Sequence, residues 1–357
     1  MKRVCFVNTT PFWGGGEKWH TENAIAMSER DFDVHFILHS DGEIKDRIKN
    51  TSIDYYQVNI GSFSFLNYFT KKQIANYLIS KKIDTIIVND SRDLKTIGLV
   101  AKKVGIKRVI YRRGIARPVN ATRFNQFIYS RLVSDIIFNS EETKKQFFSN
   151  LVEADIKAKQ HLLYNGLEIK EYTQNHKSND KIIIGNASRL TEQKGIEYLI
   201  ELAQILKKND VNAEIRIAGK GHLQEQLEEQ RKDNGLEDYF KLVGFYDDVH
   251  EFLSELDIYV CSSKFEGFGF SIAEAMLHKL PVVGFDISSN PEVIEHEKTG
   301  YLVSPFDVEE LYQATIKIIN SSNLRSELGE NGFNKASNQF DREKGFDKLV
   351  QILEIDK

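Results

Sequence analysis

Two glutamates, Glu266 and Glu274, flank a glycine-rich segment and have seven residues between them. The apolar run 256–261 before this segment predicts a short buried strand, and the run 273–277 after it predicts an apolar helix. A strand that leads through a glycine-rich loop into a helix presents backbone N–H groups and the positive end of a helix dipole, both of which favour an anion. Carboxylates beside an anion fit a ligand that also carries hydroxyls, because an ionised carboxylate accepts several hydrogen bonds.

A nucleotide diphosphate sugar has both of these parts. Its diphosphate would lie on the backbone of the loop and the helix start, Glu274 would accept ribose hydroxyls, and Glu266 would accept hydroxyls of the sugar. The loop residues predicted to bind it are Gly267, Phe268, Gly269 and Phe270. An alternative needs no ligand, since Ser271 and Glu274 have the S-x-x-E spacing of a helix capping box. That box leaves Glu266 and the two glycines unexplained.

The sequence E-G-F-G-F-S-I-A-E-A-M from Glu266 onward resembles the E-x7-E signature of glycosyltransferase family 4. The segments 280–283, 290–294, 300–303 and 188–190 extend the similarity over most of the second half of the chain. The resemblance implies a GT-B fold, in which two Rossmann-like doubly wound α/β domains face each other across a cleft. It also implies a retaining transfer from a nucleotide diphosphate sugar, a UDP-sugar more than a GDP-sugar, to an acceptor hydroxyl. Cell-surface polysaccharide, lipopolysaccharide or glycolipid assembly is the expected setting.

Two further groups follow from position and from this resemblance. Arg189 and Lys194 come after a predicted strand at 181–187, where two positive charges can hold a diphosphate, and in similar enzymes they do so. Gly15 and Gly16 lie in a glycine-rich loop after the first strand, which in the resembled family faces the donor diphosphate. A flexible surface turn is the alternative for these glycines.

Arg113 ends a predicted strand, at about the place where related enzymes have a histidine. Because arginine stays protonated, we expect Arg113 to act on phosphate or leaving-group charge and not as a base. His20 is a second polar candidate on the first helix and is expected to be an exposed histidine.

Length and pattern predict the domains. A chain of 357 residues exceeds what one core usually supports, and short β-branched strands alternate with helices in both halves. We expect an acceptor-binding domain at 1–168, a linker at 169–180, a nucleotide-sugar-binding domain at 181–340, and a C-terminal helix at 341–357 that crosses back to the first domain. Both cysteines, Cys5 and Cys261, lie in apolar runs and are expected to be buried thiols in a reducing compartment.

The charge is unevenly divided. Residues 1–180 hold 28 Lys and Arg against 20 Asp and Glu, whereas residues 181–357 hold 20 against 32, so the halves carry +8 and −12. The stretch 102–131 has nine basic residues and no acidic one, and an aromatic and basic stretch spans 63–72. Such segments suit an anionic membrane surface, although an ordinary helix on a sheet gives a similar pattern. The acceptor is then expected to be a glycan or a lipid-linked acceptor. We expect the protein to be cytoplasmic, or peripheral at the inner face of the membrane. We expect no signal peptide and no membrane span.

Further expectations concern metal ions, cofactors and alternative functions. No Asp-x-Asp motif or histidine cluster has metal-ligand spacing, so we expect a metal-independent enzyme with no cofactor. A GT-B epimerase or phosphorylase, or a non-catalytic nucleotide-sugar-binding protein, would keep the fold and change the chemistry. No nucleic-acid-binding motif occurs, and the acidic second half would repel a long polyanion.

Overall fold

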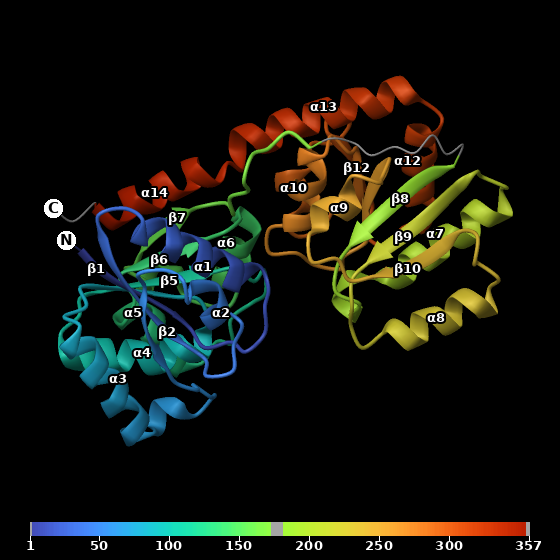
Figure 1. Cartoon of the computed structure of the whole chain (residues 1–357). Coiled ribbons are helices and arrows are strands. Elements are labelled where there is room, and N and C mark those ends of the chain that lie inside the picture. Colours follow the sequence, from blue (N-terminus) through green and yellow to red (C-terminus); the bar gives the residue numbers. More distant parts are fainter. Residues whose placement is uncertain (1, 173–180, 355–357) are drawn as a thin grey trace. The chain divides into compact units, whose positions relative to one another are not determined.

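The computed structural model describes residues 2–172 and 181–354, which form two compact units. Residues 1–165 and 346–357 make up the N-terminal unit, and residues 166–345 make up the C-terminal unit. Each unit is an α/β domain around one parallel sheet (Figure 1). The predicted linker at 169–180 lies largely outside the described residues and stays a prediction.

The N-terminal unit has a seven-stranded sheet in the order β3-β2-β1-β4-β5-β6-β7, with every neighbouring pair parallel. This is the doubly wound order of Rossmann folds, extended by one strand. Its strands are β1 Lys2–Asn8, β2 Phe32–Leu38, β3 Asp54–Gln57, β4 Thr85–Val88, β5 Arg108–Arg113, β6 Asp135–Phe138 and β7 Lys159–Leu162.

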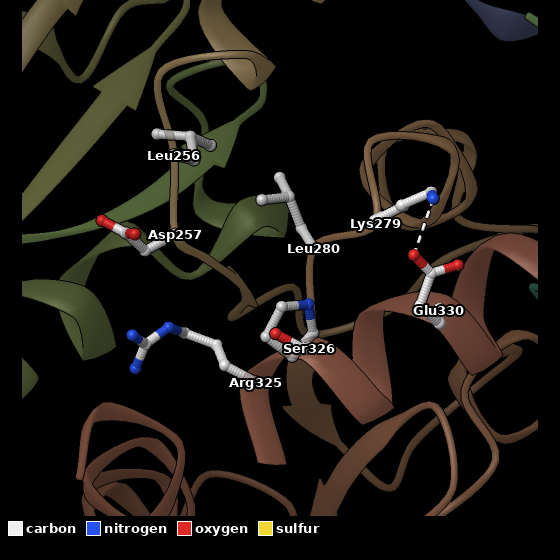
Figure 2. A pocket seen from close by; sticks show the side chains of 8 residues that line it. Leu256, Asp257, Lys279, Leu280, Arg325, Ser326 and Glu330 are labelled. Carbon is white, nitrogen blue, oxygen red and sulfur yellow. Dashed lines mark hydrogen bonds and ion pairs between the residues drawn. The ribbon is translucent and has the colours of Figure 1, made fainter. Parts of the chain in front are cut away.

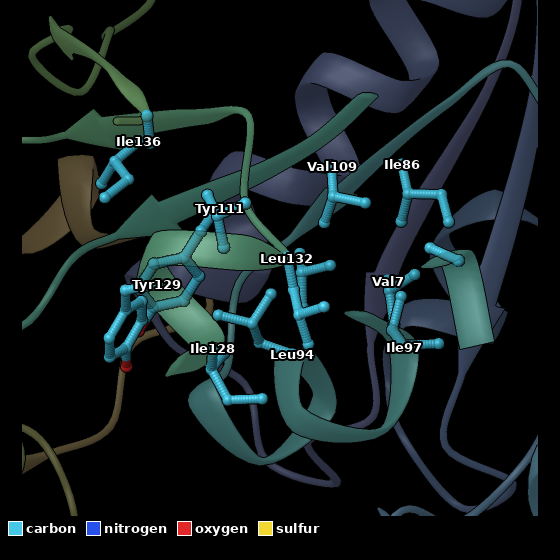
Figure 3. Close-up of a cluster of buried hydrophobic side chains, with 14 of the residues drawn as sticks. Val7, Ile86, Leu94, Ile97, Val109, Tyr111, Ile128, Tyr129, Leu132 and Ile136 are labelled. Atoms are coloured by element: carbon cyan, nitrogen blue, oxygen red, sulfur yellow. The ribbon is translucent and has the colours of Figure 1, made fainter. Parts of the chain in front are cut away.

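Helices cover both faces of this sheet, because successive side chains of a strand point to opposite faces. Val4 and Phe6 of β1 pack in the core beneath α1, α2 and α14, whereas Cys5 and Val7 pack in the core beneath α3 to α6. Figure 3 shows the second of these cores, where Val7 lies near Ile97 of α4. The helices are α1 Gly15–Ser28, α2 Ile44–Ile48, α3 Tyr68–Ser80, α4 Ser91–Val104, α5 Arg123–Arg131, α6 Glu141–Phe148 and α14 Arg342–Glu354, with the 3₁₀ turns η1 Ser64–Leu66 and η2 Glu153–Asp155.

The C-terminal unit repeats the arrangement with six parallel strands in the order β10-β9-β8-β11-β12-β13. Its strands are β8 Ile182–Ala187, β9 Ala213–Ala218, β10 Phe240–Gly244, β11 Ile258–Cys261, β12 Val282–Phe285 and β13 Gly300–Val303. Its helices are α7 Ile196–Lys208, α8 Gln224–Asp233, α9 Val249–Leu253, α10 Phe270–Leu277, α11 Asn290–Val293, α12 Val308–Ile319 and α13 Ser322–Gln339, with the 3₁₀ turn η3 Glu192–Lys194. The predicted doubly wound α/β class is therefore confirmed in both units.

Several details of the sequence prediction can be checked here. Cys5 and Cys261 are buried free thiols, as predicted, and burial raises the pKa of Cys261 to about 11. Strand β3 was not predicted, because it lies at the sheet edge with all four residues only half-buried and so lacks an apolar run. Among the described residues, none of the helices is both long and apolar enough to cross a membrane.

Candidate functional site

The predicted donor-binding residues lie at the centre of the C-terminal sheet. Strands β8 and β11 are neighbours in this sheet, and the chain leaves them toward opposite sides of the sheet order. In doubly wound sheets such a switch point forms a crevice at the carboxyl ends of the strands, where ligands bind. Arg189 and Lys194 follow β8, and the glycine-rich segment with Glu266 follows β11. The fold therefore brings the two predicted groups of residues to the same end of the sheet, at its switch point.

An ion pair joins the two groups directly. Lys194 Nζ donates to Glu266 Oε1 over 2.5 Å, and the two side chains are only 13% and 11% exposed. A charge-assisted hydrogen bond of this length, mostly removed from water, is strong and fixes both groups in place. An ammonium group has three donors, so Lys194 can bind Glu266 and still donate to a ligand.

Hydrogen bonds to main-chain carbonyls hold the two loops together around this pair. The N–H group of Lys264 donates to the carbonyl of Gln193 over 2.8 Å, and Gln193 Nε2 donates to the carbonyl of Phe265 over 3.0 Å. Ser262 Oγ donates to the carbonyl of Lys194 over 2.9 Å. The loop after β8 and the loop after β11 thus form one connected structure.

Two serines in the segment after β12 form hydrogen bonds with the backbone of Glu266. Ser288 Oγ and Ser289 Oγ donate to the carbonyl of Glu266 over 2.6 and 3.2 Å, and the N–H group of Glu266 donates back to Ser288 Oγ over 3.2 Å. These serines were not predicted as part of the site. They follow β12, so position after a central strand was the signal that could have found them.

Gly195 is required where the two loops meet. It adopts a φ of +59°, and a Cβ atom there would lie 2.2 Å from the carbonyl oxygen of Ser262. Only glycine permits both the left-handed conformation and this close approach.

Arg189, in contrast, has an exposed side chain, and its Nη2 donates to Gln193 Oε1 over 3.4 Å. It lies in the same loop as Lys194 without belonging to the buried pair.

Glu274 lies one turn inside α10, which begins at Phe270 after Gly269. The Gly269 N-cap has a φ of +87° and makes no side-chain capping bond, so the alternative that Ser271 and Glu274 form a capping box is wrong. Glu274 is 9% exposed, and its negative charge contributes to raising the pKa of Tyr172, after burial and the charges of Glu168 and Asp248. Glu274 is therefore a buried carboxylate in the first turns of α10 that has no capping role.

Phe268 has a structural side chain. It is buried and packs edge-on against Phe270 and Phe340. Packing of this ring holds the loop between Glu266 and α10 against the body of the unit. Any contact that Phe268 makes with a ligand would then come from its backbone.

Gly15 and Gly16 form the first turn of α1 and not a loop, which corrects the prediction of a glycine loop or a flexible turn. The N-cap Gly14 makes no side-chain capping bond. A Cβ atom on Gly16 would lie 2.6 Å from Nδ2 of Asn89, which follows β4. The glycine therefore lets the start of α1 pack against the switch point between β1 and β4 of the N-terminal sheet.

Arg112, not the predicted Arg113, is the centre of a polar network at this edge of the N-terminal sheet. Its Nη1 donates to Asn89 Oδ1 over 3.0 Å and its Nη2 to Asn165 Oδ1 over 2.7 Å. Burial lowers the pKa of Arg112 to about 10, an effect that the nearby carboxylate of Glu17 opposes. Glu17 in turn accepts a hydrogen bond of 3.0 Å from Asn8 Nδ2.

Arg113 points to the other side of the sheet because strand residues alternate. Its Nη1 donates to Tyr111 Oη over 3.3 Å and its Nη2 to the carbonyl of Arg117 over 2.7 Å, while Nε has no hydrogen-bond partner among the described residues. The expectation that His20 is exposed is wrong, because its ring is fully buried and packs edge-on against Phe6. Burial, reinforced by the charge of Arg112, holds the pKa of His20 well below its usual range.

A sequence signal for the Arg112 network was available. Asparagine stands at the carboxyl end of β1, β4 and β6 and again at Asn165 after β7. Asparagine carries a donor and an acceptor on a short side chain, which suits groups that line a polar edge. The repeated residue at equivalent places indicates where such an edge lies.

The C-terminal unit also has a pocket of about 210 Å³, lined in part by Asp257, Lys279, Arg325 and Glu330 (Figure 2). It lies beside the residues that precede β11 and β12, at the amino ends of these strands. Lys279 Nζ pairs with Glu330 Oε1 over 2.6 Å within it. The pocket is therefore at the opposite end of the strands from Lys194 and Glu266. In the described part of the chain, no group of three or more His, Cys, Asp or Glu residues is placed to hold a metal ion.

Comparison with known proteins relates part of the chain to one family. Residues 168–335 match the family Glycosyl transferases group 1. A poly(ribitol-phosphate) alpha-N-acetylglucosaminyltransferase of Staphylococcus aureus is 29% identical over 48% of this chain. The matched part covers only 35% of the length of that relative. An uncharacterized glycosyltransferase of Haemophilus influenzae is 25% identical over 98% of both chains. The capsular polysaccharide biosynthesis glycosyltransferase CapM of Staphylococcus aureus is 23% identical over 91% of this chain and 90% of its own.

Among solved structures, HepE of Anabaena in complex with UDP and glucose superposes with a TM-score of 0.85 at 22% identity, over 99% of this chain and 100% of its own. At this identity the likeness shows the fold, which is GT-B. The relatives with names are glycosyltransferases, several of them of polysaccharide and capsule biosynthesis. Residues 168–335 are therefore similar to glycosyl transferases group 1, and the chain has the GT-B fold.

Proposed function

We propose that this protein is a retaining glycosyltransferase that moves a sugar from a nucleotide diphosphate sugar to an acceptor hydroxyl. The observation that carries the proposal is the buried Lys194–Glu266 pair at the switch point of the C-terminal sheet. Such a pair offers a positive group for a diphosphate and a negative group for sugar hydroxyls within one hydrogen bond of each other. Glu274, in the first turns of α10, would accept the ribose hydroxyls.

In the proposed reaction, the acceptor oxygen forms a bond to the anomeric carbon of the donor sugar. The bond between that carbon and the diphosphate oxygen breaks, and the proton of the acceptor hydroxyl passes to the departing diphosphate. The step develops positive charge on the sugar and negative charge on the leaving group, which preorganised donors stabilise. Lys194, Arg189 and the backbone of residues 267–270 would supply these donors. Gly15, Gly16 and Arg113 of the N-terminal unit stay predicted contributors to donor binding and to leaving-group charge.

This scheme assigns all of the leaving-group charge to side chains and main-chain amides, so we propose that the enzyme needs no metal ion or cofactor. UDP is the favoured nucleotide, because HepE, which has the same fold, was crystallised with it. The acceptor is proposed to be a glycan or a lipid-linked glycan of a cell-surface polymer, as the names of the relatives suggest.

The test begins with the donor. A thermal-shift screen over UDP- and GDP-sugars should show a raised melting temperature for one of them, because a ligand that binds only the folded protein stabilises it. That donor is then incubated with the enzyme, candidate acceptors and a chelator, and the products are followed by mass spectrometry. NMR of the new linkage should show the anomeric configuration of the donor. An inverted linkage, or no transfer by a protein that binds the donor, would contradict the proposal.

A further inference from the structure

An exposed apolar and basic surface of the N-terminal unit has no role in the proposed transfer. Its apolar part is formed by side chains around η1 and the start of α3, of which Phe63 and Phe69 are 76% and 75% exposed. The exposed large apolar side chains that we assign to this surface are Phe63, Leu66, Tyr68, Phe69 and Phe127. Scattered apolar residues are ordinary on a protein surface, but four within seven residues form a patch that indicates a partner.

The patch is held in a fixed conformation. Phe65, between the exposed residues, packs inward against Phe124 of α5 with ring centroids 5.0 Å apart. Asn67 caps α3, since its side chain accepts hydrogen bonds from the N–H groups of Phe69 and Thr70. The neighbours of Phe65 are therefore turned outward by a structured turn, so their exposure is built into the fold.

Basic residues surround this patch. Lys71 and Lys72 follow within the first turn of α3, and α4 places Lys103 Nζ 5.9 Å from the ring of Tyr68 and Lys102 Nζ 5.3 Å from the ring of Phe127. Helices α3, α4 and α5 lie on the same face of the sheet (Figure 1). The sequence has no acidic residue from 55 to 83 or from 94 to 134, so nothing within these segments neutralises the lysines.

We infer that this aromatic–basic surface binds the protein to an anionic lipid bilayer. Aromatic rings sit at the level of the lipid headgroups, and lysines beside them meet the negative surface charge. A second copy of the chain is a poorer partner, because two copies of this surface would bring like charges together. The inference concerns the N-terminal unit alone and does not depend on the proposed transfer reaction.

Flotation with vesicles tests it without any substrate. Wild-type protein should float with vesicles of phosphatidylcholine and about one third phosphatidylglycerol at low salt, and should float far less with phosphatidylcholine alone or at high salt. Phe63→Ser/Phe69→Ser should bind at least about ten-fold more weakly, because two rings no longer enter the interface. Lys71→Gln/Lys72→Gln should lose roughly five-fold in binding for each charge removed.

Phe245→Ser is the matched control, because Phe245 in the C-terminal unit is a similarly exposed phenylalanine with Lys220 Nζ 4.5 Å from its ring. It should float like the wild type. All variants change exposed side chains except at Lys71, which is half-buried, so their melting temperatures should stay close to that of the wild type. The inference is overturned if the wild type does not bind anionic vesicles at low salt, or if the patch variants bind as well as Phe245→Ser. It is also overturned if light scattering shows that the patch variants convert a dimer to a monomer while vesicle binding is unchanged.

Discussion

Lys194 Nζ lies 2.5 Å from Glu266 Oε1, and the two residues are 72 positions apart in the sequence. They meet because the strands before them, β8 and β11, are neighbours at the centre of the sheet. The pair is mostly buried, so each charge depends on the other in the absence of a ligand. Function and stability are therefore linked at this point of the molecule.

The first prediction concerns that dependence. Lys194→Met should lower the free energy of unfolding by about 3 kcal/mol, because it leaves the Glu266 carboxylate buried without its partner. The double variant Lys194→Met/Glu266→Gln should recover most of this loss, since no unpaired charge then remains. Urea denaturation of both single variants and the double variant gives the coupling energy. Additive effects of the two changes would show that the pair contributes little.

The second prediction separates the two carboxylates. Glu274→Ala should weaken donor binding by about 10- to 100-fold, because hydrogen bonds to a charged group are lost. Glu266→Ala should instead lower kcat with a smaller effect on KM, because this residue is proposed to contact the sugar that reacts. Steady-state kinetics and calorimetric titration with the donor measure both effects. If both variants are folded and fully active, the donor site has been placed wrongly.

The third prediction compares the two adjacent arginines. Arg112→Gln should destabilise the N-terminal unit by about 1–3 kcal/mol, since Asn89 and Asn165 lose their buried donor. Arg113→Gln should lower turnover at saturating donor, if its charge acts on the leaving group as proposed. Thermal unfolding and kcat are measured for both variants. Equal turnover of Arg113→Gln and wild type would remove Arg113 from the mechanism.

The sequence could not show which of Arg112 and Arg113 points to which face of the sheet. All six residues of β5 are buried, so no alternation of polar and apolar residues marks which side chain faces which side. His20 was misjudged for a similar reason, because α1 buries polar residues such as Glu17 and Thr21 beside apolar ones. The doubly wound class and the central strands were predictable, since buried parallel strands give continuous β-branched runs.

The site was only partly predictable. The glycine-rich segment that follows Glu266 could be predicted from its own composition as a loop between a strand and a helix. The contact between Glu266 and Lys194 could not be predicted, because the approach depends on the hydrogen bonds of Gln193 and on the left-handed conformation of Gly195. Long-range contacts of this kind leave little trace in the sequence around each residue.

A fourth prediction concerns Asp93, which is fully buried and accepts hydrogen bonds from the N–H group and Oγ1 of Thr9 over 2.8 and 2.5 Å. Burial raises the pKa of Asp93 to about 7, against about 3.8 when unfolded. Between these values the folded state binds the extra proton, so this group's contribution to stability falls as pH rises from about 4 to about 7 and is constant above. Urea midpoints measured across this range should show a downward trend for wild type that Asp93→Asn lacks. Parallel trends for the two proteins would contradict the assignment.

A fifth prediction has the opposite sign. His278 is buried, its Nε2 lies 2.9 Å from Nδ1 of His250, and Tyr172 stacks on both rings at 4.2 Å. Burial, with the neighbouring His250, lowers the pKa of His278 to about 4. Its contribution is therefore present above pH about 6.5 and is lost as pH falls toward 4, because the unfolded chain binds the proton first. His278→Gln should lose less stability than wild type over this acid range, measured by thermal unfolding, and an unchanged acid sensitivity would exclude this source.

The hydrogen bonds of Gln193 with the N–H group of Lys264 and with the carbonyl of Phe265 have a consequence for motion. Neither loop can open while the other stays closed without breaking them, so the segments 192–195 and 264–266 should open as one cooperative unit. Amide hydrogen exchange would then proceed at a shared rate in both segments and slow in both together when the donor binds. A ligand that touches one loop would in this way also order the other.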